Sequence, residues 1–233
     1  MRSMLQCLQI RQFAVERVSS MGFYEENRDD MISYVSTMLS QFDANSQRKQ
    51  QVHYNRFDHT MRVFKWMLQL YEASPEKEHI DFDSLAIATL FHDIGYNENP
   101  QNHAAYGAAL CRKYLEERQY APEKTDFICD LIAHHSNKEV LFQDIPMELV
   151  LLMEADLLDD TGAQALVMDT WFEIVDKEQP TFESILAHME AFSVKYMQNN
   201  PMRTEKGKQL WEDKRILTEA FVEAYREDLR ITN

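Results

Sequence analysis

Two stretches of the chain are apolar at almost every position, whereas most of the remaining sequence alternates between apolar and polar residues. The first covers residues 85–91 and ends in His92 and Asp93, and the second covers residues 147–158 and contains Asp156. A helix that is apolar on all of its faces belongs in the middle of a helical bundle. The pattern therefore predicts two buried central helices that carry acidic residues close to their ends.

The other helices are predicted from apolar residues that recur at intervals of three and four positions. Such stripes cover residues 4–20, 27–42, 57–71, 103–114, 122–135, 163–174, 182–192 and 204–226. Pro75, Pro100 and Pro146 fall between the stripes. Gly95 follows the His-Asp pair and is expected to end the first central helix in a left-handed conformation.

The composition supports an all-α fold. The 233 residues include only 5 Gly and 6 Pro, while 45% are hydrophobic, which favours long helices joined by short connections. The polar segment 43–51 is the best linker candidate. We therefore expect a helical bundle at residues 51–233 that forms one compact domain. An N-terminal helical appendage at residues 1–50 would precede it as a packing surface or a homodimer contact.

Charge and cysteine content restrict the partners and the compartment. The formal net charge of −15 disfavours a nucleic-acid polymer, because phosphate neutralisation requires clustered Lys and Arg. A small phosphorylated ligand remains compatible with this charge, since a bound divalent cation reverses the local field. Cys7, Cys111 and Cys129 show no paired spacing, the N-terminus lacks a continuous apolar core, and no run approaches membrane-spanning length. These features predict a cytoplasmic protein with buried thiols and no membrane partner.

The aspartate at the end of the first central helix needs compensation. An isolated carboxylate away from water would take up a proton, so Asp93 requires a cation, several hydrogen-bond donors or a metal ion. His59, His92, Asp93 and Asp156 lie in three separate helical segments, and their convergence on one divalent ion would make their burial tolerable. Two imidazoles and two carboxylates suit Mn, Fe, Co, Ni or Zn, with Mg as a further candidate, and leave positions for water and substrate.

The order of these residues resembles a known signature. His59, then Phe-His-Asp-Ile-Gly at residues 91–95, then Glu-Ala-Asp-Leu-Leu-Asp at residues 154–159 is similar to the H…HD…D pattern of the HD-domain superfamily of metal-dependent phosphohydrolases. The similarity runs from about Asp58 to the C-terminus. Residues 156–163, 202–204 and 206–208 also resemble small bacterial stand-alone HD hydrolases. The resemblance implies an all-α bundle whose four motif residues hold the metal, and some members hydrolyse nucleotides or their pyrophosphate bonds.

Three further histidines match places that the resemblance assigns to a second ion. In relatives with two metal ions, a histidine that opens the helix after the His-Asp pair and a histidine before the final aspartate help to hold the second ion. His103 and the pair His134 and His135 match these places, and Asp93 could bridge the ions. With one ion, the same histidines would contact phosphate oxygens or donate a proton to the leaving group. Consecutive helical residues do not easily face one point, and the family's spacing from Ile132 favours His135, whereas the other histidine would be a surface residue.

The sequence departs from the family pattern beside the last metal aspartate. Relatives commonly have an Asp and an Arg where this chain has Glu154 and Leu157, so a phosphate contact from that Arg is missing. Arg62, one helical turn after the first motif histidine, is the candidate for supplying positive charge instead, with an ordinary surface Arg as the alternative. Asp93 or Asp159 could orient the attacking water.

Together these residues predict a metal-dependent phosphohydrolase that acts on a small phosphorylated substrate, with a nucleotide as the first choice. One or two cations would activate water for in-line attack on phosphorus and screen the developing charge. The expected catalytic residues are Asp93, His103 and His135, and the expected substrate contacts are Arg62, His134 and Asp159. Two alternatives remain open: a di-iron oxygenase on the same HD-type scaffold, and a non-catalytic HD module that binds a nucleotide.

Overall fold

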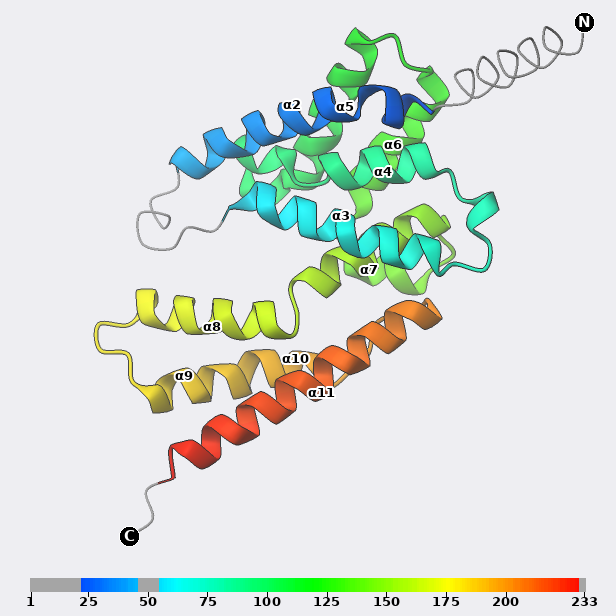
Figure 1. Ribbon diagram of the computed structural model, residues 1–233. Helices are drawn as coiled ribbons and strands as arrows, with labels where there is room; N and C mark the ends of the chain where they lie inside the picture. Colours follow the sequence, from blue (N-terminus) through cyan, green and yellow to red (C-terminus); the bar gives the residue numbers. More distant parts are fainter. Residues whose placement is uncertain (1–21, 46–54, 231–233) are drawn as a thin grey trace, which may run out of the picture.

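The computed structural model describes residues 22–45 and 55–230, which form helices and connecting loops without a β-strand (Figure 1). The predicted all-α class is confirmed. The main bundle consists of α2 (Phe23–Asn45), α3 (Arg56–Glu72), η2 (Lys77–His79), α4 (Phe82–Phe91), η3 (Ile94–Asn97), η4 (Pro100–Asn102), α5 (His103–Glu117), α6 (Pro122–His134), η5 (Lys138–Phe142) and α7 (Met147–Asp159). A second layer consists of α8 (Ala163–Asp176), α9 (Phe182–Met189), the π-helical turn η6 (Glu190–Val194), α10 (Lys195–Met197) and α11 (Glu205–Asp228). The predicted helix over residues 4–20 lies outside the described residues.

Helices α4 and α7 lie in the middle of the main bundle, where the two apolar stretches predicted them. Residues 84–91 of α4 are all buried, and so are residues 148–155 of α7. Asp81 fixes the start of α4, because its carboxylate accepts hydrogen bonds from the backbone N–H of Ser84 (3.4 Å) and from its hydroxyl (2.6 Å). The helix ends ten residues later at Phe91, so His92 and Asp93 form the turn that leaves it.

Helix α2 packs against the same core as α4 and α7. Its buried side chains in this core are Tyr24, Met31, Val35 and Leu39. Asp30 on the same helix accepts hydrogen bonds from the Tyr114 hydroxyl (2.5 Å) and from the Arg118 guanidinium (2.6 Å), which fixes α2 to the end of α5. The division of the chain at residue 50 stays a prediction, and residues 46–54 lie outside the described residues.

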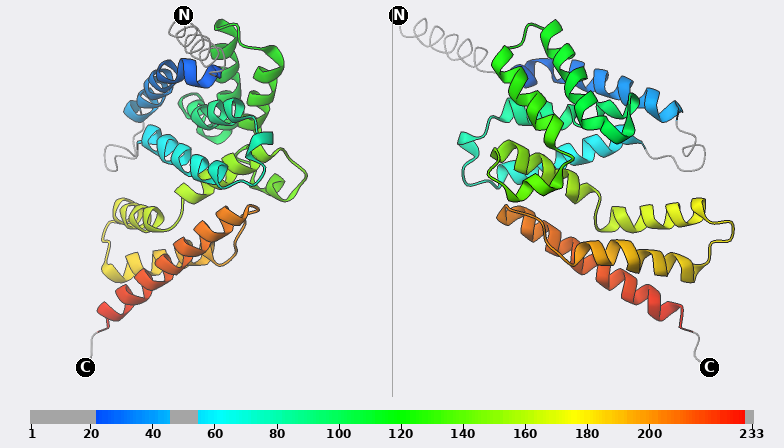
Figure 2. Two further views of the ribbon diagram at one scale, coloured as in Figure 1. Left: turned by 45° about the vertical axis from the view of Figure 1, so that its right-hand side comes forward. Right: turned by 180° about the vertical axis from the view of Figure 1, so that it is seen from behind.

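The second layer lies beside the main bundle, with α8, α9 and α11 roughly side by side (Figures 1 and 2). Its own small core is formed by Leu166, Ile185, Met189 and Val222. Glu154 of α7 joins it to the bundle, because its buried carboxylate accepts hydrogen bonds from the backbone N–H groups of Arg203 and Thr204 and from the Thr204 hydroxyl. The start of α11 is thereby fixed relative to the helix that carries Asp156.

The prediction that Gly95 adopts a left-handed conformation is wrong. Among the described glycines, a positive φ occurs at Gly162 (69°), between α7 and α8. Gly95 lies in η3, where a Cβ atom would stand 2.0 Å from the carbonyl oxygen of His103 and 2.4 Å from the backbone nitrogen of Gly107. Gly95 is therefore required for close packing, because it lets α5 approach the turn that carries the His-Asp pair.

The described cysteines have the buried, unpaired thiols that the sequence predicted. Cys111 and Cys129 are buried and free, and Cys7 lies outside the described residues. Within residues 22–45 and 55–230, no helix is both long enough and apolar enough to cross a lipid bilayer.

Candidate metal centre

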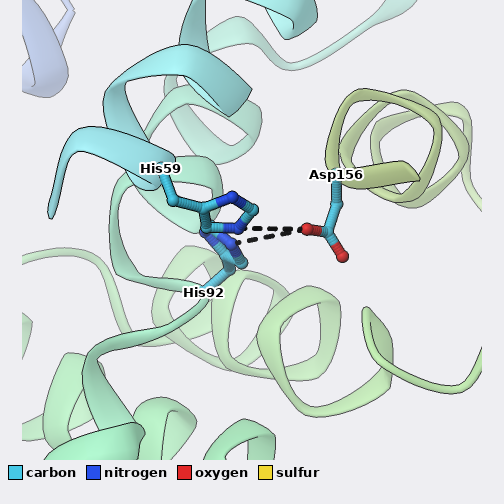
Figure 3. Close-up of side chains that lie close together, drawn as sticks. All are labelled: His59, His92 and Asp156. Carbon is cyan, nitrogen blue, oxygen red and sulfur yellow. Dashed lines mark ion pairs between the residues drawn. The ribbon is translucent and has the colours of Figure 1, made fainter. Parts of the chain in front are cut away.

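Three of the four predicted ligands converge where α3, α4 and α7 meet (Figure 3). The Nε2 atom of His59 lies 3.3 Å from Oδ1 of Asp156, and the Nε2 atom of His92 lies 3.9 Å from the same oxygen. One ligand atom from each residue lies within 4.8 Å of the others, so a single cation could contact all three. Both imidazoles are almost completely buried, with 1% exposure each.

Asp93, the fourth predicted ligand, lies between two groups of imidazoles. Its Oδ2 atom lies 3.5 Å from Nε2 of His59 and 3.4 Å from Nε2 of His92. Its Oδ1 atom lies 3.5 Å from Nε2 of His103 and 3.6 Å from Nε2 of His135. The two oxygens of one carboxylate thus face two separate positions, each surrounded by imidazole nitrogens.

The second position is formed by the first residue of α5 and the residue directly after α6. The Nε2 atoms of His103 and His135 lie 3.3 Å apart. His134 is not part of this group: its imidazole is half-exposed and contacts the backbone and side chain of Asp130. The structure therefore brings His103 and His135 to the cluster and turns His134 toward solvent.

Hydrogen bonds at Nδ1 fix how the imidazoles are presented. The Nδ1 atoms of three rings contact backbone carbonyl oxygens: His92 with Thr89 (2.8 Å), His103 with Pro100 (3.1 Å) and His135 with Ile132 (2.7 Å). A carbonyl oxygen only accepts, so the proton resides on Nδ1 and the Nε2 lone pair faces the cluster. Two such lone pairs 3.3 Å apart repel each other unless they share a cation or a proton.

His92 supplies the most direct indication of an electron-pair acceptor at this site. Its Nε2 atom is buried and has no hydrogen-bond partner among the described residues. A buried polar atom without a partner costs about 1–3 kcal/mol, so such atoms are uncommon without a functional reason. Coordination of a divalent cation would satisfy this nitrogen, and the mixed imidazole and carboxylate set around it suits a divalent transition metal.

Each carboxylate of the cluster also has a cationic neighbour. Arg56 Nη1 donates to Asp93 (3.0 Å), and Lys138 Nζ donates to Asp156 (2.6 Å). The sequence interpretation missed both residues, although Arg56 precedes the first motif histidine by three positions and Lys138 follows His135 by three. Arg56 thus lies about one helical turn before His59 on α3, whereas Lys138 lies at the start of η5, just after the end of α6.

Arg62 and Asp159 form a pair behind the cluster. The Arg62 guanidinium donates to both carboxylate oxygens of Asp159, with Nε–Oδ1 at 2.9 Å. Asp159 also contacts Nδ1 of His59 at 2.8 Å, so it orients that imidazole. The role of this pair as substrate contacts stays a prediction, while its observed contacts support His59.

The pKa values of the two central histidines are shifted in opposite directions. Burial lowers the pKa of His59, but its contacts with Asp156 and Asp159 outweigh burial and raise this pKa to about 10. Burial also lowers the pKa of His92, here without such compensation, to about 4. Against the effect of burial, neighbouring imidazoles and Arg56 hold the pKa of Asp93 well below its usual value. The cluster therefore favours ionised carboxylates with an added positive charge, which a proton or a divalent cation can provide.

Comparison with known families decides the identity of this region. The sequence matches the HD domain family over residues 56–161, which include His59, His92, Asp93 and Asp156. The region that contains the candidate metal centre is therefore an HD domain. The superfamily binds divalent metal ions, and the His and Asp clusters of this HD domain could hold one.

Solved structures extend the similarity beyond the HD domain. An HD-superfamily hydrolase from Bacillus thuringiensis matches with a TM-score of 0.64 and 21% identity, over 88% of this chain and 97% of that one. Bacillus subtilis YpgQ, determined in complex with ADP, matches with a TM-score of 0.62 and 17% identity over 88% and 95%. A predicted HD superfamily hydrolase from an uncultured Thermotogales bacterium gives 0.59 and 18% over 90% and 100%. At these identities the similarity to solved structures concerns the fold alone. A comparison with curated proteins gave no significant match.

Proposed function

We propose that this HD-domain protein is a metal-dependent phosphohydrolase that acts on a small phosphorylated substrate, specifically a nucleotide. The observation that carries the proposal is the inward-facing set of Nε2 lone pairs around Asp93, including the buried Nε2 of His92 that has no hydrogen-bond partner among the described residues. Such an arrangement is costly without a cation and useful with one.

The ligands fall into two groups that share Asp93. His59, His92, Asp93 and Asp156 would hold one divalent cation, and Asp93, His103 and His135 would hold a second. A bound cation lowers the pKa of water and offsets the negative charge that develops at phosphorus. Because burial lowers the pKa of His103, its imidazole is neutral at pH 7, which favours a ligand role for this residue over proton donation.

The cationic side chains next to the ligands would help to receive the phosphate. Lys138 and Arg56 each lie at a carboxylate of the cluster and partly reach solvent, with side-chain exposures of 33% and 19%. They add local positive charge in a protein whose net charge is −15. This local charge suits a compact phosphate group, whereas a long polyanion would also meet the acidic remainder of the surface. YpgQ, which shares the fold, was crystallised with ADP, and this supports a nucleotide as the substrate class.

The second group of candidate ligands would also suit a different enzyme class, a di-iron oxygenase. Such an enzyme would require iron at both positions, and His103, His135 and Asp93 provide the imidazole and carboxylate groups for the second. Iron content together with oxygen uptake would favour this function. Nucleotide binding without any turnover would instead favour a non-catalytic HD module.

The deciding experiment uses protein that has been stripped of metal with a chelator and then supplied with single divalent cations. Nucleoside mono-, di- and triphosphates and simple phosphoesters are assayed, and products are separated by chromatography. Nucleoside monophosphate with pyrophosphate indicates cleavage of the bond between the α- and β-phosphates of a triphosphate, and nucleoside with phosphate indicates a nucleotidase. His92→Ala should abolish turnover and His79→Ala, an exposed histidine in η2, should not. Activity that survives His92→Ala would contradict the proposal.

A further inference from the structure

A cavity of about 650 Å³ lies between the HD domain and the second layer. At one end its lining includes Lys138, which bonds Asp156, and Asp160, which belongs to a carboxylate and imidazole group with His59 and Asp159. The cavity thus lies next to the candidate metal centre. Its volume lies in the range of about 300–1,000 Å³ that is usual for small-molecule sites.

The sides of the cavity are apolar and aromatic. Leu157, Met197 and Trp211 line it and are buried. Phe142 and Phe192 also line it, yet their side chains are 75% and 59% exposed. Exposed aromatic rings that line one hollow leave apolar surface in contact with water, and this arrangement is typical of a binding site for a flat ring.

The lining also includes a carboxylate from outside the candidate metal cluster. Asp169 of α8 and Ser193 of the π-helical turn η6 both line the cavity, and the Ser193 hydroxyl donates to Asp169 Oδ2 at 2.5 Å. The other oxygen, Oδ1, lies 3.5 Å from Nε2 of His188. A π-helical turn costs regular hydrogen bonding and is often found at functional sites. Here it places Ser193 beside the carboxylate and Phe192 at the aromatic side of the cavity.

We propose that this cavity binds the organic half of the substrate, a planar aromatic ring that carries an amino group, while the phosphate lies at the metal centre. The inference rests on the proposed phosphohydrolase function and specifies its substrate. The ring lies against Phe142 and Phe192, and its amino group donates to Asp169. These residues determine specificity, because they touch the part of the substrate that does not react.

Binding of the ring and binding of the phosphate can be measured separately. Phe142→Ala and Phe192→Ala each raise KM for a nucleotide about tenfold, in line with the loss of one aromatic–base contact, and leave kcat nearly unchanged. Inorganic tripolyphosphate, which has no ring, keeps its KM or its inhibition constant in both variants. Phe182→Ala is the matched control, because Phe182 is 67% exposed at the start of α9 and does not line the cavity.

The proposed contact of Asp169 is tested with nucleotides that differ in the ring amino group. Adenosine nucleotides carry an amino group at the ring position where inosine nucleotides carry a carbonyl oxygen. Cytidine and uridine nucleotides differ in the same way. The wild-type protein is expected to prefer the amino member of at least one pair in kcat/KM. Asp169→Asn, which replaces an acceptor by a donor, reduces that preference. Equal kcat/KM values within both pairs for the wild type would overturn the assignment of Asp169.

Failure of the cavity proposal can be distinguished from failure of the proposed function. If nucleotides are hydrolysed and the two cavity variants change KM no more than Phe182→Ala does, the cavity does not bind the ring. If no phosphate compound is hydrolysed with any cation, the proposed function fails. In that case, binding of adenosine to the metal-stripped protein, measured by saturation-transfer NMR, tests whether the cavity binds the ring. Binding that is lost in Phe142→Ala and Phe192→Ala supports the proposal, and binding that persists overturns it.

Discussion

Binding of a divalent cation should stabilise the native protein, and His92→Ala should remove that stabilisation. The candidate ligand side chains come from α3, from the end of α4 and from α7, so the unfolded chain does not present them together. A ligand that binds only the native state adds about 2.7 kcal/mol to the free energy of unfolding when its free concentration is about 100-fold above Kd. For a domain of this size each kcal/mol raises Tm by about 2–4 °C, so the expected rise is about 5–11 °C.

His92 is the most informative position for this experiment. Its Nδ1 atom bonds the Thr89 carbonyl, while its buried Nε2 atom has no hydrogen-bond partner among the described residues. Removal of the imidazole therefore costs one hydrogen bond and some packing in the metal-stripped protein, and it deletes the ligand atom. The helical content should persist, because the core of α4 is built by other buried residues.

The assay is a set of thermal unfolding curves followed by circular dichroism. Chelator-treated wild type, His92→Ala and the control His79→Ala are each titrated with Mn²⁺, Co²⁺, Ni²⁺, Zn²⁺, Fe²⁺ and Mg²⁺. The wild type and the control should show the rise in Tm with at least one cation. An equal rise in His92→Ala at the same cation concentrations would refute its role as a ligand. No rise in the wild type with any cation would refute the metal centre itself.

Because His135 faces Asp93 while His134 faces solvent, His135→Ala should lower kcat/KM at least about tenfold and His134→Ala should leave it near wild type, as steady-state kinetics will show. Glu154→Ala removes the acceptor for two backbone amides at the start of α11 and should reduce the free energy of unfolding by about 2–3 kcal/mol in urea denaturation. The pKa of His92 falls from 6.5 to about 4 on folding, so the native state binds fewer protons between these values. Its contribution to the stability of the metal-stripped protein is present above pH 6.5 and lost as the pH falls through 4, and the pH dependence of the urea midpoint should be weaker in His92→Ala.

The helical core and most of the candidate His and Asp cluster could be predicted from the sequence because both follow from local patterns. An apolar stretch without a polar face has no stable place except the middle of the bundle, and α4 and α7 occupy it. Asp156 lies inside one such stretch and His92 directly follows the other, so both need partners, and they could be grouped with His59 before their distances were known.

Features that depend on tertiary packing could not be predicted in the same way. Arg56 and Lys138 look like ordinary surface residues in the sequence, and only the arrangement of the helices brings them to Asp93 and Asp156. The need for Gly95 comes from the backbone of α5, which the sequence near residue 95 does not reveal. Glu154 was read as a departure from a phosphate-binding pattern, whereas its carboxylate holds the start of α11.

The two ends of the cavity come from different parts of the chain. The match to the HD domain ends at residue 161, whereas Phe192 and Asp169 lie in the second layer. Evolution could therefore retain the reactive centre while residues 163–228 diverge and change which compound is accepted. A chimera that joins this HD domain to the corresponding helices of a relative should inherit the substrate preference of that relative, provided that the contact between Glu154 and the start of α11 is preserved.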